Sequence, residues 1–266
     1  MEIIASLNLP MQIFLLTISA LLLGSFISLL SYRLATKEPI VFARSKCVNC
    51  GVALKIKNLI PLFSWIFQLG KCGNCKGKIS WRYPLIELGC VAAFLVVYFA
   101  LGSHLDLKTI LYCLIAATMI LMVATDIEHY FIPDISQIFL ALLVAVAVIA
   151  GGGTNAAIVN VKAAFIYLLF SLALYGFFYF VAKIEAIGVD DMKFFFIAGL
   201  MLGMNGFLPF MLLSGVFGIL FGVCWHKIKK EEIFPFAPAL CMSMFVCMLF
   251  SKKIDPIDLV GSLLFL

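Results

Sequence analysis

Two aspartates, each at the end of a long apolar run, are the residues of this chain best suited to chemistry. Asp126 lies in Ala-Thr-Asp-Ile-Glu-His-Tyr-Phe-Ile-Pro-Asp134, and Asp191 lies in Gly188-Val-Asp-Asp-Met-Lys193. Ionisable side chains at membrane depth are costly and therefore usually functional. Two carboxyl groups that meet at a membrane boundary favour an aspartyl protease that cuts a peptide inside or beside the bilayer.

A helix cap is the competing interpretation of an aspartate at the end of an apolar run. For a single aspartate considered alone we prefer the cap, and Asp134 after Pro133 fits an N-cap. Glu128 and His129 lie next to Asp126 in sequence. They either tune the site or are ordinary loop residues, and we prefer the second interpretation.

Four of the nine cysteines form two Cys-x-x-Cys pairs, each followed closely by a glycine. They are Cys47, Cys50, Cys72 and Cys75. Two such knuckles offer four thiolates to one tetrahedral metal ion, and closed ligation by four cysteines is typical of structural zinc. Disulfides and a redox motif are the alternatives. A cytoplasmic loop is reducing, which disfavours disulfides, and paired knuckles exceed what a redox motif needs.

The composition excludes a soluble domain of this size. The chain has 266 residues, of which 64% are hydrophobic and 12% charged, and its mean hydropathy is +1.15. Recurring apolar runs of about 18 residues predict an all-α integral membrane protein with about eight transmembrane helices. The expected spans are 10–34, 83–101, 107–125, 133–150, 160–182, 192–205, 207–225 and 234–250. A turn between Gly203 and Gly206 separates the sixth span, which is the weakest, from the seventh.

The distribution of charge predicts the orientation. Residues 36–82 contain nine basic residues and only Glu38 as an acid, so this zinc-ribbon-like loop is expected in the cytoplasm. Counting spans from this loop places Asp126 and Asp191 on the same cytoplasmic face. The positive-inside rule also explains the net charge of +5, so we expect no nucleic-acid partner.

The predicted organisation has four parts. They are the first transmembrane span (1–35), the cytoplasmic zinc-binding loop with its four cysteines (36–82), the transmembrane peptidase core (83–250) and a C-terminal tail (251–266).

Several segments, in one order, resemble the motifs of type IV prepilin peptidases over about residues 20–240. They are Gly24-Ser-Phe-Ile-Ser-Leu-Leu-Ser-Tyr-Arg33-Leu, Arg44-Ser-Lys-Cys-Val-Asn-Cys-Gly, Asn58-Leu-Ile-Pro-Leu-Phe-Ser-Trp65, Gly70-Lys-Cys-Gly-Asn-Cys, Ile79-Ser-Trp-Arg-Tyr-Pro-Leu-Ile-Glu87, the segments of the two aspartates, and Phe234-Pro-Phe-Ala-Pro238.

The resemblance implies an inner-membrane aspartyl peptidase with Asp126 and Asp191 as catalytic residues. Such enzymes remove the basic leader from type IV prepilins and type II secretion pseudopilins. Many then methylate the new N-terminal amine from S-adenosylmethionine, and the cysteine-bearing loop marks this bifunctional form. Gly70 and Glu87 are our candidates near the cofactor. The alternatives are a knuckle turn for Gly70 and, for Glu87, a salt bridge to Arg82 or to another basic residue at the membrane edge.

This chain departs from the family pattern at one catalytic motif. The family's Gly-x-Gly-Asp reads Gly188-Val-Asp190-Asp191, which adds a third carboxyl group. Asp191 takes the catalytic position because its spacing to Lys193 is kept. Two other functions remain open: a peptidase without methyltransferase activity, and a non-enzymatic membrane scaffold whose zinc module docks a partner.

Overall fold

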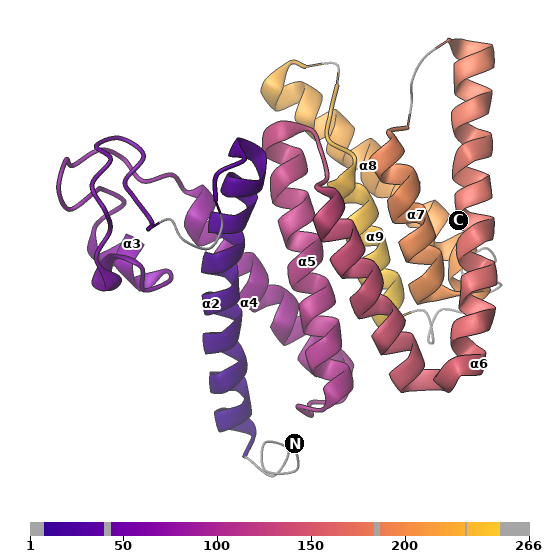
Figure 1. Ribbon diagram of the computed structural model, residues 1–266, viewed down its shortest axis with the longest axis horizontal. Helices are drawn as coiled ribbons and strands as arrows, with labels where there is room; N and C mark the ends of the chain where they lie inside the picture. Colours follow the sequence, from indigo (N-terminus) through magenta and orange to yellow (C-terminus); the bar gives the residue numbers. More distant parts are fainter. Residues whose placement is uncertain (1–7, 40–43, 184–186, 232, 251–266) are drawn as a thin grey trace, which may run out of the picture. The chain divides into compact units, whose positions relative to one another are not determined.

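The computed structural model describes residues 8–39, 44–183, 187–231 and 233–250, and most of them are helical (Figure 1). The predicted all-α class is confirmed. The helices are α2 (Leu9–Thr36), η1 (Ile56–Asn58), α3 (Phe63–Phe67), α4 (Arg82–Ala100), α5 (Leu107–His129), α6 (Asp134–Phe177), η2 (Phe178–Ala182), α7 (Val189–Leu202), η3 (Met204–Gly206), α8 (Phe207–Lys229) and α9 (Ala237–Phe250). The predicted tail, 251–266, lies outside the described residues.

Five of the described helices, α2, α4, α5, α6 and α8, are long and apolar enough to cross a membrane. Helix α6 has 44 residues and breaks at Gly153, whose φ is 72°. At 1.5 Å per residue it is about 66 Å long, about twice the thickness of a bilayer core, so its two arms correspond to two of the expected spans. Figure 1 shows these arms joined at a sharp turn. The chain is therefore a multi-pass membrane protein, and the expected count of about eight is roughly matched.

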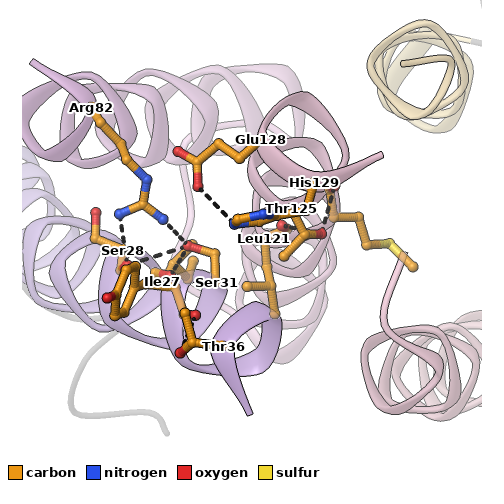
Figure 2. A network of polar contacts seen from close by, with 11 residues as sticks. Ile27, Ser28, Ser31, Thr36, Arg82, Leu121, Thr125, Glu128 and His129 are labelled. Atoms are coloured by element: carbon orange, nitrogen blue, oxygen red, sulfur yellow. Dashed lines mark hydrogen bonds and ion pairs between the residues drawn. The ribbon is translucent and has the colours of Figure 1, made fainter. Parts of the chain in front are cut away.

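The contacts divide the chain into two compact units, residues 1–125 and 126–266. In the first unit, α2 and α4 approach closely at Gly24, where an added Cβ would lie 2.7 Å from the Cα of Glu87. Further along α2, the guanidinium of Arg82 donates to the carbonyl oxygen of Ser28 at 3.0 Å and to the hydroxyl of Ser31 at 2.6 Å (Figure 2). The start of α4 is thereby tied to α2.

In the second unit, α7 packs against the second arm of α6. An added Cβ at Gly199 would lie 2.7 Å from the Cα of Ala164, so the two backbones nearly touch. The Tyr167 hydroxyl donates to the carbonyl oxygen of Gly203 at 3.0 Å. Helix α7 ends at Leu202 and α8 begins at residue 207, which confirms the predicted turn. This packing positions the amino end of α7, where Asp191 lies.

Candidate active site

Asp126 lies in the last turn of α5 and is buried, with 7% of its surface exposed. Its Oδ2 atom accepts a hydrogen bond of 2.8 Å from the backbone N–H of Ala237, the first residue of α9. The N–H groups of a first helical turn have no partner inside the helix. One of them here orients a carboxyl group that is 111 residues distant in sequence.

Asp191 is the third residue of α7, and its Oδ2 atom accepts a hydrogen bond of 3.2 Å from the backbone N–H of Gly188. This contact is half of a capping box, so the cap that we considered as an alternative is present. Asp126 and Asp191 nevertheless line one cavity of about 150 Å³. Asp191 can therefore cap α7 and still face the same cavity as Asp126.

Asp190 also lines this cavity, but its carboxylate has a cationic partner. The ammonium of Lys193 lies 3.0 Å from Oδ1 of Asp190 and 2.5 Å from Oδ1 of Asp134. Residues three apart on a helix lie on the same face, which explains why Lys193 pairs with Asp190 and not with Asp191. A carboxylate held in an ion pair is poorly suited to carrying a proton.

The N-cap expected at Asp134 is wrong by one residue. Helix α6 already includes Asp134, its N-cap is Pro133, and that position has no side-chain cap. Proline has no N–H and its fixed φ suits the position before a helix. The Asp134 side chain is consequently available to Lys193.

The residues that follow Asp126 have different surroundings. His129 lies 3.9 Å from a carboxylate oxygen of Glu128, and Figure 2 shows this pair. Tyr130 lines the cavity of the two aspartates, and its hydroxyl donates to Oε2 of Glu231 at 2.5 Å. Sequence reasoning singled out neither Tyr130 nor Glu231, because nothing in the local sequence indicates that the end of α8 returns to the end of α5.

Two glycines of α8 accommodate the segment that brings Ala237 to Asp126. A Cβ at Gly218 would lie 2.9 Å from the Phe236 ring, and one at Gly222 would lie 3.2 Å from the Phe234 ring. Small residues let membrane segments approach closely. The glycine face of α8 therefore helps to fix the position of the Ala237 N–H.

We expect Gly218→Val to displace Phe236, weaken the bond from Ala237 to Asp126, and lower kcat for the peptide cleavage that the family resemblance implies. A hydrogen bond to a charged group contributes about 1.5–3 kcal/mol, so the loss should be about tenfold to a hundredfold. Gly215→Val is the control, because nothing lies within 4 Å of a Cβ added there. Steady-state cleavage kinetics compare the two proteins. Equal kcat values would contradict a positioning role for the glycine face.

The four cysteines of the two knuckles come together in the first unit. Their Sγ atoms lie within 4.8 Å of one another, and those of Cys47 and Cys75 are 3.9 Å apart. The N–H of Cys47 donates to Val52 at 2.9 Å, and the N–H of Cys72 donates to Gly77 at 2.8 Å, so each knuckle closes as a tight turn. None of the four is joined to another described cysteine by a disulfide. The cluster could hold a metal ion.

Gly70 and Glu87 both shape the module of the four cysteines. Gly70 has a φ of +65° and would bring a Cβ to 3.0 Å from the Trp65 ring, so a side chain there is disfavoured. The Oε2 atom of Glu87 accepts the backbone N–H of Leu62 at 2.6 Å. These contacts agree with the turn expected at Gly70. Arg82, the alternative partner of Glu87, contacts α2 as described above. A role near a cofactor stays a prediction for both residues.

The comparison with known proteins covers most of this architecture. The bacterial Peptidase A24 N-terminal domain matches residues 18–101, and the type IV leader peptidase family matches residues 113–223. A prepilin leader peptidase/N-methyltransferase of Burkholderia pseudomallei is 30% identical over 89% of this chain and 84% of its own length. The chain belongs to the type IV leader peptidase family.

Other members of this family are similarly related to the chain. A prepilin leader peptidase/N-methyltransferase of Bacillus subtilis is 29% identical over 90% of this chain and 95% of its own length. One of Stutzerimonas stutzeri is 30% identical over 79% and 73%, respectively. No solved structure is significantly similar to the chain. The match to the type IV leader peptidase family includes both Asp126 and Asp191 but ends before Ala237.

Proposed function

We propose that this leader peptidase family member cleaves the leader of type IV prepilins and type II secretion pseudopilins and then N-methylates the new N-terminal residue. The observation that carries the proposal is the meeting of Asp126 and Asp191, from α5 and α7, in one cavity. Membership of the family and the names of the curated relatives support the same activity.

The two carboxyl groups suffice for peptide hydrolysis without a covalent intermediate. One accepts a proton from water as the water attacks the peptide carbonyl, and the other donates a proton to the carbonyl oxygen and later to the leaving amine. Two neighbouring carboxyl groups cannot easily both ionise, so they share a proton and titrate as a pair. Among the described residues, the second oxygen of each has no hydrogen-bond partner and is available to water and substrate.

The cysteine cluster is proposed as a structural zinc site. Four thiolates at the usual zinc–sulfur distance of about 2.3 Å lie about 3.8 Å apart at the corners of a tetrahedron. The 3.9 Å between the sulfurs of Cys47 and Cys75 fits this arrangement. A closed set of four ligands leaves no position for substrate, so the metal would support folding.

S-adenosylmethionine is proposed as the methyl donor, because the curated relatives are named N-methyltransferases. The donor would supply the methyl group to the amine released by cleavage. Gly70 and Glu87 are engaged in contacts that shape the cysteine module. We propose that both lie near the cofactor and act there by positioning the module.

The positive charge of residues 36–82 supports a cytoplasmic location for the cysteine module and for the two aspartates. We place the chain in the bacterial inner membrane on the same grounds. An active site at the cytoplasmic edge would meet a substrate with a membrane helix and a basic cytoplasmic leader at the junction of the two.

The purified chain in a bilayer, a synthetic prepilin and labelled S-adenosylmethionine test the proposal in one reaction. We expect the shortened product to appear first and to acquire label afterwards. Cleavage without incorporation of label would show a peptidase that has no methyltransferase activity. Absence of both products would favour the non-enzymatic scaffold whose metal module docks a partner.

A further inference from the structure

Residues 56–69 of the cysteine module (residues 44–81) expose an unusual amount of apolar surface. Ile56, Phe67 and Leu69 are 87%, 82% and 83% exposed, respectively. Large apolar side chains also lie partly exposed between them, at Leu59, Ile60, Phe63 and Ile66. Exposed apolar side chains concentrated in one short segment normally contact a partner or a membrane.

The contact of Leu62 with Glu87 sets the depth of this stretch along α4. Glu87 lies five residues inside the helix from Arg82, which is about 7.5 Å along the axis. The backbone N–H of Leu62 lies 2.6 Å from the carboxylate of Glu87, so Leu62 lies beside the first turns of α4 and not beyond its end. Arg82 is the first residue of α4 and the charged residue that precedes its apolar run, so we take it as the boundary of the span; its guanidinium binds Ser28 and Ser31 of α2.

Helix α2 gives the same depth independently. Gly24 is the residue of α2 that approaches Glu87, whereas Ser28 and Ser31 bind Arg82. Ser28 and Ser31 lie four and seven residues beyond Gly24, which is about 6–10 Å along the axis of α2. Helix α2 continues beyond these serines to Thr36. In the view of Figure 1, α3 lies apart from α2, level with its carboxyl-terminal half and not above its end.

The charge of the module restricts the partner. Residues 44–81 contain no aspartate or glutamate. The basic residues in this range are Arg44, Lys46, Lys55, Lys57, Lys71, Lys76 and Lys78. A module of one sign attracts anionic phospholipid headgroups and repels a basic peptide. The leader of a prepilin is thus a poor occupant of this surface.

We propose that residues 56–69 of the cysteine module lie in the membrane interface of the leaflet on the module's side, with their apolar side chains among the acyl chains and the neighbouring lysines on anionic headgroups. Depth, exposure and charge each support the same occupant. The proposal rests on the membrane character of the chain and is independent of peptidase activity.

Quenching by brominated lipids tests this contact in the full chain. Trp65, Trp81 and Trp225 are replaced by phenylalanine, and one tryptophan is placed at Phe67 or, as the control, at Val48, which is 72% exposed in the first knuckle. In nanodiscs of acyl-brominated phosphatidylglycerol we expect at least about twofold quenching of Phe67→Trp and clearly less of Val48→Trp. Brominated phosphatidylcholine should quench Phe67→Trp less, because the lysines lose their anionic partner.

A protein-covered or water-exposed surface gives different results. Iodide in the buffer would quench Phe67→Trp if the side chain faced water, and neither quencher would act if another protein surface covered it. Either result, or equal lipid quenching at both positions, overturns the proposal. Hydrogen exchange of the unsubstituted chain is the second measurement. Amides of residues 56–69 should exchange about tenfold more slowly in phosphatidylglycerol than in phosphatidylcholine. Equal exchange would overturn the headgroup contact.

Discussion

Asparagine in place of Asp126, or in place of Asp191, is expected to abolish leader cleavage while the protein still inserts into the membrane. Asparagine keeps the size of the side chain and can still accept the N–H of Ala237 or Gly188. It cannot carry a proton between water and the leaving amine, and such catalysis accounts for a factor on the order of 10²–10⁴. Cleavage of a synthetic prepilin by the purified variants measures the loss.

Two neighbouring aspartates are the matched controls. Asp190→Asn and Asp134→Asn remove carboxylates that pair with Lys193, so substantial cleavage should remain. The double variant of Asp126 and Asp191 should be no slower than either single variant, because residues that act as a unit are not additive. An inactive Asp190→Asn together with an active Asp191→Asn would show that the catalytic assignment belongs to the other neighbour.

Cys72→Ser is expected to remove most of the zinc and to lower methylation more than cleavage. The wild-type chain should contain about one zinc equivalent, since four thiolates complete a tetrahedral site. Metal binding supplies folding free energy to small modules, on the order of 10 kcal/mol. The two aspartates lie in the second unit, whereas the cysteines lie in the first. Metal analysis, with cleavage and methylation measured on the same preparation, tests whether the cysteine module serves methylation more than cleavage.

Cys224→Ser is the control for thiol chemistry, because Cys224 is an exposed free cysteine outside the cluster. It should keep its zinc and both activities. A metal-free wild-type protein with a disulfide among the four cysteines would contradict the zinc site. If cleavage failed first in Cys72→Ser while methylation persisted, the module would support the peptidase site.

The sequence alone determined the features that depend on neighbouring residues. Apolar runs of sufficient length form helices in a bilayer because every backbone group must be satisfied inside the segment. Each Cys-x-x-Cys pair is followed by a glycine within two residues, and each knuckle closes through bonds between residues a few positions apart. The predicted turn at Gly203 has a positive φ value, which glycine adopts at low cost. The position of the aspartates followed from the ends of the same apolar runs.

Only the tertiary structure decided which groups from distant segments meet. The Ala237 N–H reaches Asp126 across 111 residues, and Glu87 holds Leu62 across 25. In sequence, Lys193 is close to both Asp190 and Asp191. The turn of α7 brings it to Asp190, and the packing of α7 against α6 brings it to Asp134. An apolar pattern indicates that a helix is buried or faces lipid. It does not determine which helices pack together, because many arrangements bury the same apolar surface. Close backbone packing at glycines such as Gly24 and Gly199 selects one arrangement within each unit, and that selection places the chemical groups.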